Sequence, residues 1–223
     1  MIVSKEKKFI YVGLPKCATR SISHMLYHSN SEVLLGKRHQ RAVEEKMKSP
    51  WTQGFYIEQN KSFCESLENF KSYYKFTFVR NPYARLVSCW KDKIDKEKKY
   101  NFDSVGGRYQ FKKFNHLRGL PFEEFIEYIT SSEKKLKEDK HWAPFYRVIP
   151  PWEIYYTGRI ESFQKDVSYI FKKLSIKTKK SFFIKEGKNQ TEHDHFSKYY
   201  NKKTKNLVAE AYEADFTRYN YKQ

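Results

Sequence analysis

The hydrophobic positions of this chain form short apolar runs that alternate with longer stretches of helical spacing. Short runs rich in β-branched and aromatic residues are typical of strands, and apolar positions three and four apart are typical of helices. Strands are expected at 9–12, 32–35, 74–79 and 152–158, and helices at 41–48, 66–72, 82–91, 121–129, 163–174 and 203–216. This alternation predicts an α/β protein with a parallel sheet flanked by helices, in one domain over residues 1–223.

Two segments show opposite extremes of this pattern. The helix expected at 121–129 is clearly amphipathic, with one apolar face formed by Phe122, Phe125, Ile126 and Ile129. Residues 92–118, in contrast, are polar, basic and weakly periodic. Long irregular segments of this kind are often lids or substrate loops, so we expect this one to be mobile and to contribute basic residues to an acidic acceptor.

The segment 9–23 contains a candidate anion site. The strand at 9–12 turns through Gly13 and Pro15 into a helix start at which Lys16, Thr19, Arg20 and Ser21 lie close together. The first N–H groups of a helix lack internal partners and its dipole favours negative charge, so a strand–loop–helix turn of this kind binds phosphate-like anions. A Walker A loop is not present, because Gly13 is the only glycine in the segment 9–23 and Lys16 comes early in the loop.

A second strand–turn–helix segment covers residues 74–91. Its apolar run ends at Arg80, and the pair Asn81–Pro82 interrupts the pattern, with the proline suited to the first turn of a helix. Ser88 follows within that helix.

These two segments resemble the nucleotide-binding motifs of sulfotransferases that use 3'-phosphoadenosine 5'-phosphosulfate (PAPS). The loop Pro15–Ser21 is similar to the 5'-phosphosulfate loop, which reads Pro-Lys-x-x-x-Thr-Ser, although Arg20 replaces a small hydroxyl residue. The second segment resembles the 3'-phosphate motif Val-Arg-x-Pro-x-x-Arg-Leu-x-Ser, in which the first arginine and the serine hold the phosphate. These two residues correspond to Arg80 and Ser88. Arg85 also matches the motif, and an ion pair that anchors the helix is the alternative interpretation of this residue.

Further matches extend the resemblance to the carbohydrate sulfotransferase group called sulfotransferase family 2. They comprise His141-Trp-Ala-Pro, the segment 156–166 with Gly158, Glu161 and Asp166, and a tail with 188–191, 199–200 and 215–216. Glu161 and Asp166 match family positions, and two interpretations stay open for them: a structural ion pair or helix cap, or a part in catalysis.

The resemblance implies a P-loop-like fold and transfer of a sulfuryl group from PAPS to an acceptor hydroxyl, an activity of the EC 2.8.2 type. A saccharide is the implied acceptor. The implied nucleotide-binding residues are Pro15, Lys16, Cys17, Ala18, Thr19, Arg20, Ser21, Arg80, Ser88, Lys188 and Asn189. No metal is expected to be required, because lysine and arginine supply the positive charge.

Three residues are candidates for the chemistry. Lys16 is placed to stabilise the charge that develops on the bridging oxygen. The acceptor hydroxyl must also lose a proton, and histidine suits that task near neutral pH. His39 follows the strand at 32–35 and is the first candidate for the base, while His141 is the second and is expected mainly to bind the acceptor.

Composition narrows the partners and the compartment. The 223 residues carry 44 Lys and Arg against 26 Asp and Glu, a formal net charge of +18 that implies anionic ligands or a polyanionic partner. The three cysteines are widely spaced and suggest a reducing compartment. Because the sequence shows neither a signal-peptide pattern nor an apolar run of membrane length, a cytoplasmic enzyme without a membrane anchor is expected.

Two other functions fit part of the sequence. A kinase-like P-loop nucleotide-binding protein would also use a strand–loop–helix turn, but the position of Lys16 argues against it. A basic nucleic-acid-binding module is compatible with the charge and the interleaved aromatic residues, yet no helix-turn-helix, zinc-finger or RNA-binding motif is present. We therefore expect no nucleic-acid partner.

Overall fold

The computed structural model describes residues 2–4, 7–29, 33–34, 70–95, 112–149, 153–176 and 194–223. The chain divides into two compact units. The first unit comprises residues 1–79 and 151–189, and the second comprises residues 80–150 and 190–223. The expectation of one domain stays a prediction.

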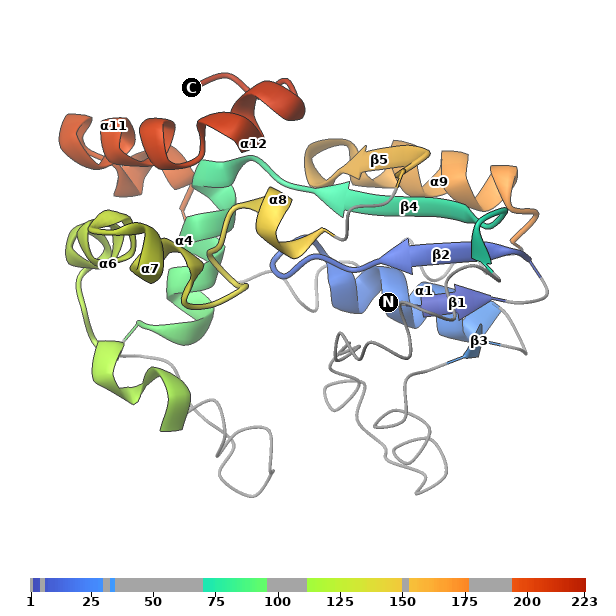
Figure 1. Ribbon diagram of the computed structural model, residues 1–223, viewed down its shortest axis with the longest axis horizontal. Coiled ribbons are helices and arrows are strands. Elements are labelled where there is room, and N and C mark those ends of the chain that lie inside the picture. The colour runs from blue at the N-terminus through green and yellow to red at the C-terminus, as the bar shows by residue number, and fades with distance from the viewer. Residues whose placement is uncertain are drawn as a thin grey trace. The chain divides into compact units, whose positions relative to one another are not determined.

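The first unit is built on a five-stranded sheet (Figure 1). The strands lie in the order β3 (Val33–Leu34), β1 (Ile2–Ser4), β2 (Phe9–Val12), β4 (Tyr74–Val79) and β5 (Tyr156–Arg159). Strands β2, β4 and β5 are parallel, whereas β1 is antiparallel to both β2 and β3.

The prediction of a wholly parallel sheet is therefore wrong, and the reason is the unpredicted strand β1. Only residues 5–8 connect β1 to β2. A parallel pair needs a long crossover connection, so strands joined this closely pair as an antiparallel hairpin. One consequence is that β3 runs in the same direction as β2, with β1 between them.

Two helices pack against one face of this sheet. They are α1 (Thr19–Ser29) and α9 (Phe163–Lys173), the latter preceded by the short helix η4 (Ile160–Ser162). Alternate residues of a strand point to the same face, which places four aromatic side chains against the helices. These residues are Phe9, Tyr11, Phe76 and Phe78, and the Phe76 ring contacts the rings of the other three.

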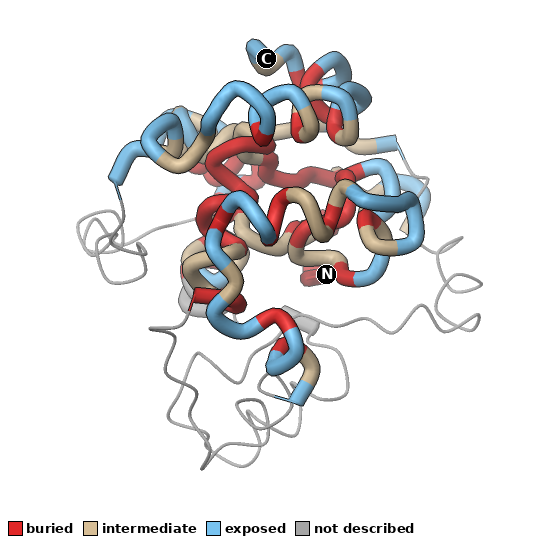
Figure 2. Tube along the Cα trace, turned by 90° about the vertical axis from the view of Figure 1, so that its left-hand side faces the viewer, coloured by how far each residue is buried: buried red, intermediate tan, exposed pale blue. Residues whose placement is uncertain are grey.

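The second unit is helical and is arranged around α4 (Pro82–Lys93). Around it lie α6 (Phe122–Thr130), α7 (Glu133–Lys137), α8 (Phe145–Val148), α11 (Lys202–Ala211), α12 (Glu213–Arg218) and the short helices η3 (Asn115–Leu117) and η6 (Phe196–Tyr199). The apolar face predicted for α6 is confirmed, because all four of its expected residues are buried. Near the C-terminus, buried positions recur about once per turn along α11 and α12, so each helix has one buried face (Figure 2).

Several predicted bounds change in the structure. The helix expected at 203–216 is two helices, because Tyr212 has non-helical backbone angles and ends α11. The segment 92–118 is ordered at both ends, since α4 continues to Lys93 and Phe114 and Leu117 are buried in the helical core. Residues 96–111, the expected helix at 41–48 and most of that at 66–72 lie outside the described residues.

No helix in the described part of the chain combines the length and the apolar character that crossing a membrane requires.

Candidate functional site

The loop between β2 and α1 has an unusual backbone. Lys16 and Ala18 both have positive φ angles, 67° and 50°, a conformation that is uncommon for residues other than glycine. The Cys17 N–H donates to the Leu14 carbonyl oxygen at 3.2 Å and closes the turn between them. Strained backbone of this kind is often found at ligand-binding sites, where the surrounding structure maintains it.

Gly13 and Thr19 determine how tightly this loop is folded. The Thr19 hydroxyl donates to the Leu14 carbonyl oxygen, so the first residue of α1 is tied to the loop that follows β2. A Cβ atom on Gly13 would lie 2.6 Å from the Thr19 methyl carbon, closer than such atoms approach in proteins. Glycine is therefore required at 13 by close approach rather than by its backbone angles.

The loop brings together most of the predicted 5'-phosphosulfate residues. Lys16 and Ser21 are half-buried and Arg20 is exposed, all within one turn of the α1 N-terminus. The first turn of α1 contains no acidic residue that would oppose an anion. Cys17 is fully buried, so its thiol packs in the interior, whereas Pro15 and Ala18 are half-buried.

The second predicted motif lies at the junction of β4 and α4. Asn81 caps the helix, because its side-chain oxygen accepts hydrogen bonds from the N–H groups of Tyr83 at 2.9 Å and Ala84 at 3.4 Å. Arg80 is half-buried just before this cap, and Ser88 is buried in the middle of α4. Their shared 3'-phosphate role stays a prediction.

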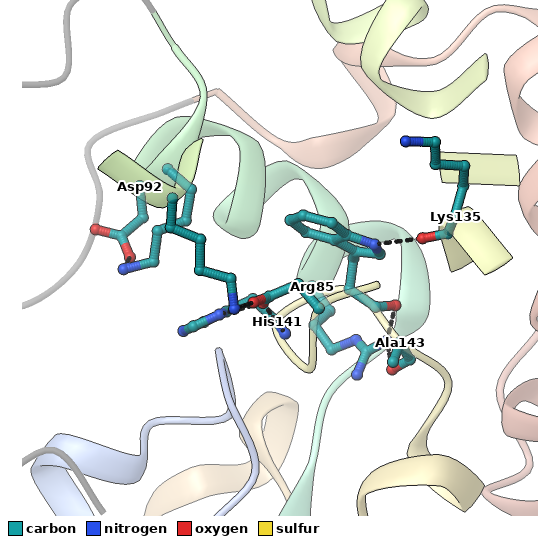
Figure 3. A network of polar contacts seen from close by, with 9 residues as sticks. Arg85, Asp92, Lys135, His141 and Ala143 are labelled. Atoms are coloured by element: carbon teal, nitrogen blue, oxygen red, sulfur yellow. Dashed lines mark hydrogen bonds and ion pairs between the residues drawn. The ribbon is translucent and has the colours of Figure 1, made fainter. Parts of the chain in front are cut away.

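Arg85 anchors α4 to the segment that contains His141. Its guanidinium Nη2 donates to the carbonyl oxygens of Trp142 at 2.9 Å and Ala143 at 2.7 Å, as Figure 3 shows. The side chain is fully buried, with its guanidinium carbon 4.2 Å from the centre of the Phe145 ring. Arg85 is therefore a helix anchor as expected, but among the described residues its hydrogen-bond partners are carbonyls and it forms no ion pair.

Asp215 holds the other end of the same segment. Both of its carboxylate oxygens accept the Phe145 N–H at 2.9 Å. Burial raises the pKa of Asp215, and the nearby positive charge of Arg85 opposes that rise. The hydroxyl of Tyr212 adds a third contact by donating to the Trp142 carbonyl oxygen at 2.6 Å.

His141 is paired with the buried carboxylate of Asp139. The His141 ring Nδ1 lies 2.5 Å from Asp139 Oδ1, and the same oxygen accepts the His141 N–H at 2.8 Å. Lys113 forms an ion pair with Asp139 Oδ2. Burial alone would raise the pKa of Asp139, but the hydrogen bonds and charges of His141 and Lys113 outweigh burial and hold it well below its ordinary value.

Two more lysines surround this pair. Lys140 is half-buried, and desolvation lowers its pKa to about 8, with Lys113 and Lys93 lowering it further and Asp139 opposing the shift. Lys93 is buried and pairs with Asp92 at 3.0 Å. The region around His141 therefore contains three lysines against the carboxylates of Asp92 and Asp139.

The motif at 156–166 has a structural explanation. Asp166 accepts hydrogen bonds from the Arg159 N–H at 2.7 Å and from two side-chain hydroxyls, so it joins the end of β5 to the first turn of α9. A Cβ atom on Gly158 would lie 2.5 Å from the Phe78 ring. Glu161 is exposed.

Three predicted site residues belong to segments that the structure does not describe. His39, Lys188 and Asn189 lie outside the described residues, so their roles stay predictions. Among the residues that are described, no three potential ligands are grouped so as to hold a metal ion.

Sequence reasoning missed Asp139, Lys113, Lys140 and Lys93. An available signal was the Asp-x-His spacing at 139–141, because aspartate often accepts the N–H two residues further along the chain.

Comparison with known proteins agrees with the motifs. The family model described as "Sulfotransferase family" matches residues 1–222. The chain is 24% identical to carbohydrate sulfotransferase 11 of Rattus norvegicus over 99% of its own length and 66% of that protein. It is 27% identical to carbohydrate sulfotransferase 14 of Danio rerio (78% of this chain, 48% of the relative) and 27% identical to carbohydrate sulfotransferase 10 of Homo sapiens (73% and 51%).

The chain thus spans about two thirds or less of the length of these relatives. No solved structure matches it. Because the family match runs almost from end to end and includes both the loop before α1 and the segment of His141, this chain belongs to the sulfotransferase family.

Proposed function

We propose that this protein transfers the sulfuryl group of PAPS to a hydroxyl group of a saccharide. The observation that carries the proposal is the strained loop before α1, which places Lys16 beside a helix N-terminus that contains no acidic residue. Family membership supports PAPS as the donor, and the names of the relatives support a carbohydrate acceptor.

In this proposal, the loop 13–19 and the first turn of α1 bind the 5'-phosphosulfate. Lys16 neutralises the negative charge that develops on the bridging oxygen as the nucleotide leaves, which is the largest demand of such a transfer. Arg80 and Ser88 bind the 3'-phosphate, and Lys188 and Asn189 approach the nucleotide from the C-terminal part of the chain. These basic side chains supply the charge that a metal would otherwise provide.

We further propose that the saccharide is acidic. Lys113 and Lys140 lie beside His141, with Lys93 close enough to affect the pKa of Lys140. Gathering lysines in a partly desolvated region is unfavourable, and a carboxylate or sulfate on the acceptor would relieve this repulsion. The overall charge of +18 agrees with an anionic acceptor.

Binding of the product nucleotide 3'-phosphoadenosine 5'-phosphate (PAP) tests the donor site. We expect PAP to raise the melting temperature in the presence of a metal chelator. Stabilisation by Mg-ATP alone would favour a kinase, and stabilisation only by an oligonucleotide would favour a nucleic-acid-binding module. Transfer of labelled sulfate from PAPS to a uronate-containing tetrasaccharide, compared with its carboxyl-reduced form, tests the acceptor.

A further inference from the structure

We propose that His141 is the base that activates the acceptor hydroxyl and that Asp139 is the residue that positions it. This inference rests on the proposed sulfuryl transfer and assigns the base to His141 in place of His39. It is carried by the contacts of Asp139 within the second unit.

The contact between Asp139 and His141 determines which ring nitrogen carries the proton. An ionised carboxylate can only accept hydrogen bonds, so His141 Nδ1 must be the donor to Asp139 Oδ1 across the 2.5 Å contact. In a neutral imidazole the other nitrogen then has the lone pair. Nε2 of His141 is therefore the nitrogen that can accept a proton, and the ring is partly accessible, with 19% of the side chain exposed.

The Asp139 carboxylate is itself held in place on both sides. Its Oδ1 also accepts the His141 N–H at 2.8 Å, and its Oδ2 pairs with Lys113. The backbone N–H of Ala143 donates to the Asp139 carbonyl oxygen at 2.8 Å, and Ala143 is in turn held by Arg85. A carboxylate fixed in this way restricts the ring to one orientation, as a base aligned by a third group requires.

A turn with only a structural role would need fewer contacts than Asp139 makes. An aspartate that caps the N–H two residues ahead needs only the backbone hydrogen bond to His141. The second contact, to the ring, and the ion pair with Lys113 add nothing to such a turn. The Asp139 carboxylate stabilises a positive charge on the ring, which is what a general base acquires during the reaction, and Lys113 fixes the carboxylate that makes this contact.

The proposed step is balanced in atoms and charge. The acceptor O–H proton passes to His141 Nε2 while the acceptor oxygen forms a bond to sulfur. The bond between sulfur and the bridging oxygen of PAPS breaks, and its electron pair leaves with PAP, where Lys16 compensates the charge. The imidazolium of His141, stabilised by Asp139, later releases its proton to water.

The test compares Asp139→Asn with the wild type in the full chain. Asparagine retains an oxygen that can accept both the backbone N–H and Nδ1–H, but it lacks the negative charge that stabilises the imidazolium, and its amide nitrogen faces the ammonium group of Lys113. With PAPS and a uronate-containing tetrasaccharide, we expect kcat to fall by about 10²–10⁴-fold, with the Kd for PAP unchanged. Nitrogen-15 NMR of the histidine rings should show Nδ1–H at His141 in the wild type, and Asp139→Ala, which removes the acceptor oxygen, should lose this preference.

Asp166→Asn is the matched control, because Asp166 is also a partly buried acceptor of several hydrogen bonds but contacts no histidine. It should retain the His141 tautomer. For His141→Ala, added imidazole should restore part of the turnover, which it should not do for Lys16→Ala.

The outcomes separate this inference from the proposed function. Failure of the wild type to bind PAP would refute the donor proposal while leaving the tautomer measurable. An Nε2–H tautomer in the wild type would overturn the inference even if Asp139→Asn failed to fold. A His141→Ala enzyme with normal turnover beside an inactive His39→Ala enzyme would return the role of base to His39.

Discussion

Asp215 and Phe145 lie 70 positions apart in the sequence, yet both carboxylate oxygens of Asp215 lie 2.9 Å from the Phe145 nitrogen. Arg85 holds the preceding carbonyls of the same segment. Asp215 of α12 and Arg85 of α4, which have opposite charges, thus hold the backbone from Trp142 to Phe145 by hydrogen bonds. The His141 segment is therefore fixed by long-range contacts rather than by its own secondary structure.

Replacing Asp215 with alanine should destabilise the protein strongly. It leaves the buried Phe145 N–H without its acceptor and removes a negative charge near Arg85, so we expect a loss of about 1–3 kcal/mol in the free energy of unfolding. Chemical denaturation measures this loss. The exposed Asp194, which pairs with Lys198 at 3.0 Å, is the control, and Asp194→Ala should change stability by about 0.5 kcal/mol or less.

Replacing Arg80 should mainly weaken PAP binding, whereas replacing Lys16 should mainly lower kcat. Arg80→Ala removes a charged hydrogen bond to the 3'-phosphate in our proposal and should weaken PAP binding by about 1.5–3 kcal/mol, measured by calorimetry. Lys16→Ala should instead lower kcat by about 10²–10³-fold with a smaller effect on PAP binding, because the charge that it neutralises grows in the transition state. If Arg80→Ala binds PAP as tightly as the wild type, the 3'-phosphate assignment is wrong.

Gly13→Ala should disturb the conformation of the loop 13–19 and thereby weaken PAP binding. Its new methyl group would displace the Thr19 side chain, whose hydroxyl holds the Leu14 carbonyl oxygen. We expect PAP affinity to fall by about tenfold or more. Gly158→Ala is a matched variant, since its methyl group would meet the Phe78 ring at 2.5 Å. It should cost about 1–3 kcal/mol of stability by overpacking; equal losses of PAP affinity in the two variants would show that the loop geometry is not special.

The acceptor KM should depend on pH through Lys140. Its pKa is lowered to about 8, so it is charged below that pH and becomes neutral above it. For a uronate-containing tetrasaccharide, KM should therefore rise above pH 8 in the wild type and show no such step in Lys140→Met. A pH profile unchanged by this substitution would remove Lys140 from the acceptor site.

The same shift makes a prediction about stability. The folded protein binds the Lys140 proton more weakly than the unfolded chain, whose lysine retains its ordinary value of 10.5. Charging Lys140 therefore costs stability below pH 8, and this cost disappears as the pH rises through 10.5. Lys140→Met should raise the melting temperature at pH 7, whereas Lys198→Met, at an exposed ion pair, should leave it nearly unchanged.

Much of the first unit follows from local sequence signals. The loop before α1 and the β4–α4 junction combine an apolar run, turn residues and a helix start, so position and type could be predicted together. Strand β1 could not, because Ile2–Ser4 is too short to show a period and is stabilised by pairing with β2 and β3.

The His141 cluster was harder to predict for a different reason. Lys113 is distant in the sequence from Asp139, and its approach depends on Phe114 packing into the helical core. Likewise, the sequence motif around Arg85 indicates an anchored helix. Its acceptors could not be predicted, because every residue has a backbone carbonyl and the sequence does not indicate that Trp142 supplies one.

Helix α4 also has a consequence for how the two substrates affect each other. Ser88, proposed to meet the nucleotide, and Arg85, which holds the His141 segment, lie three residues apart and so occupy neighbouring turns of one helix. Any shift of α4 on nucleotide binding is carried to His141 by the Arg85 hydrogen bonds. Donor and acceptor affinities are then thermodynamically linked, and by reciprocity PAP changes acceptor affinity by the same factor as the acceptor changes that of PAP.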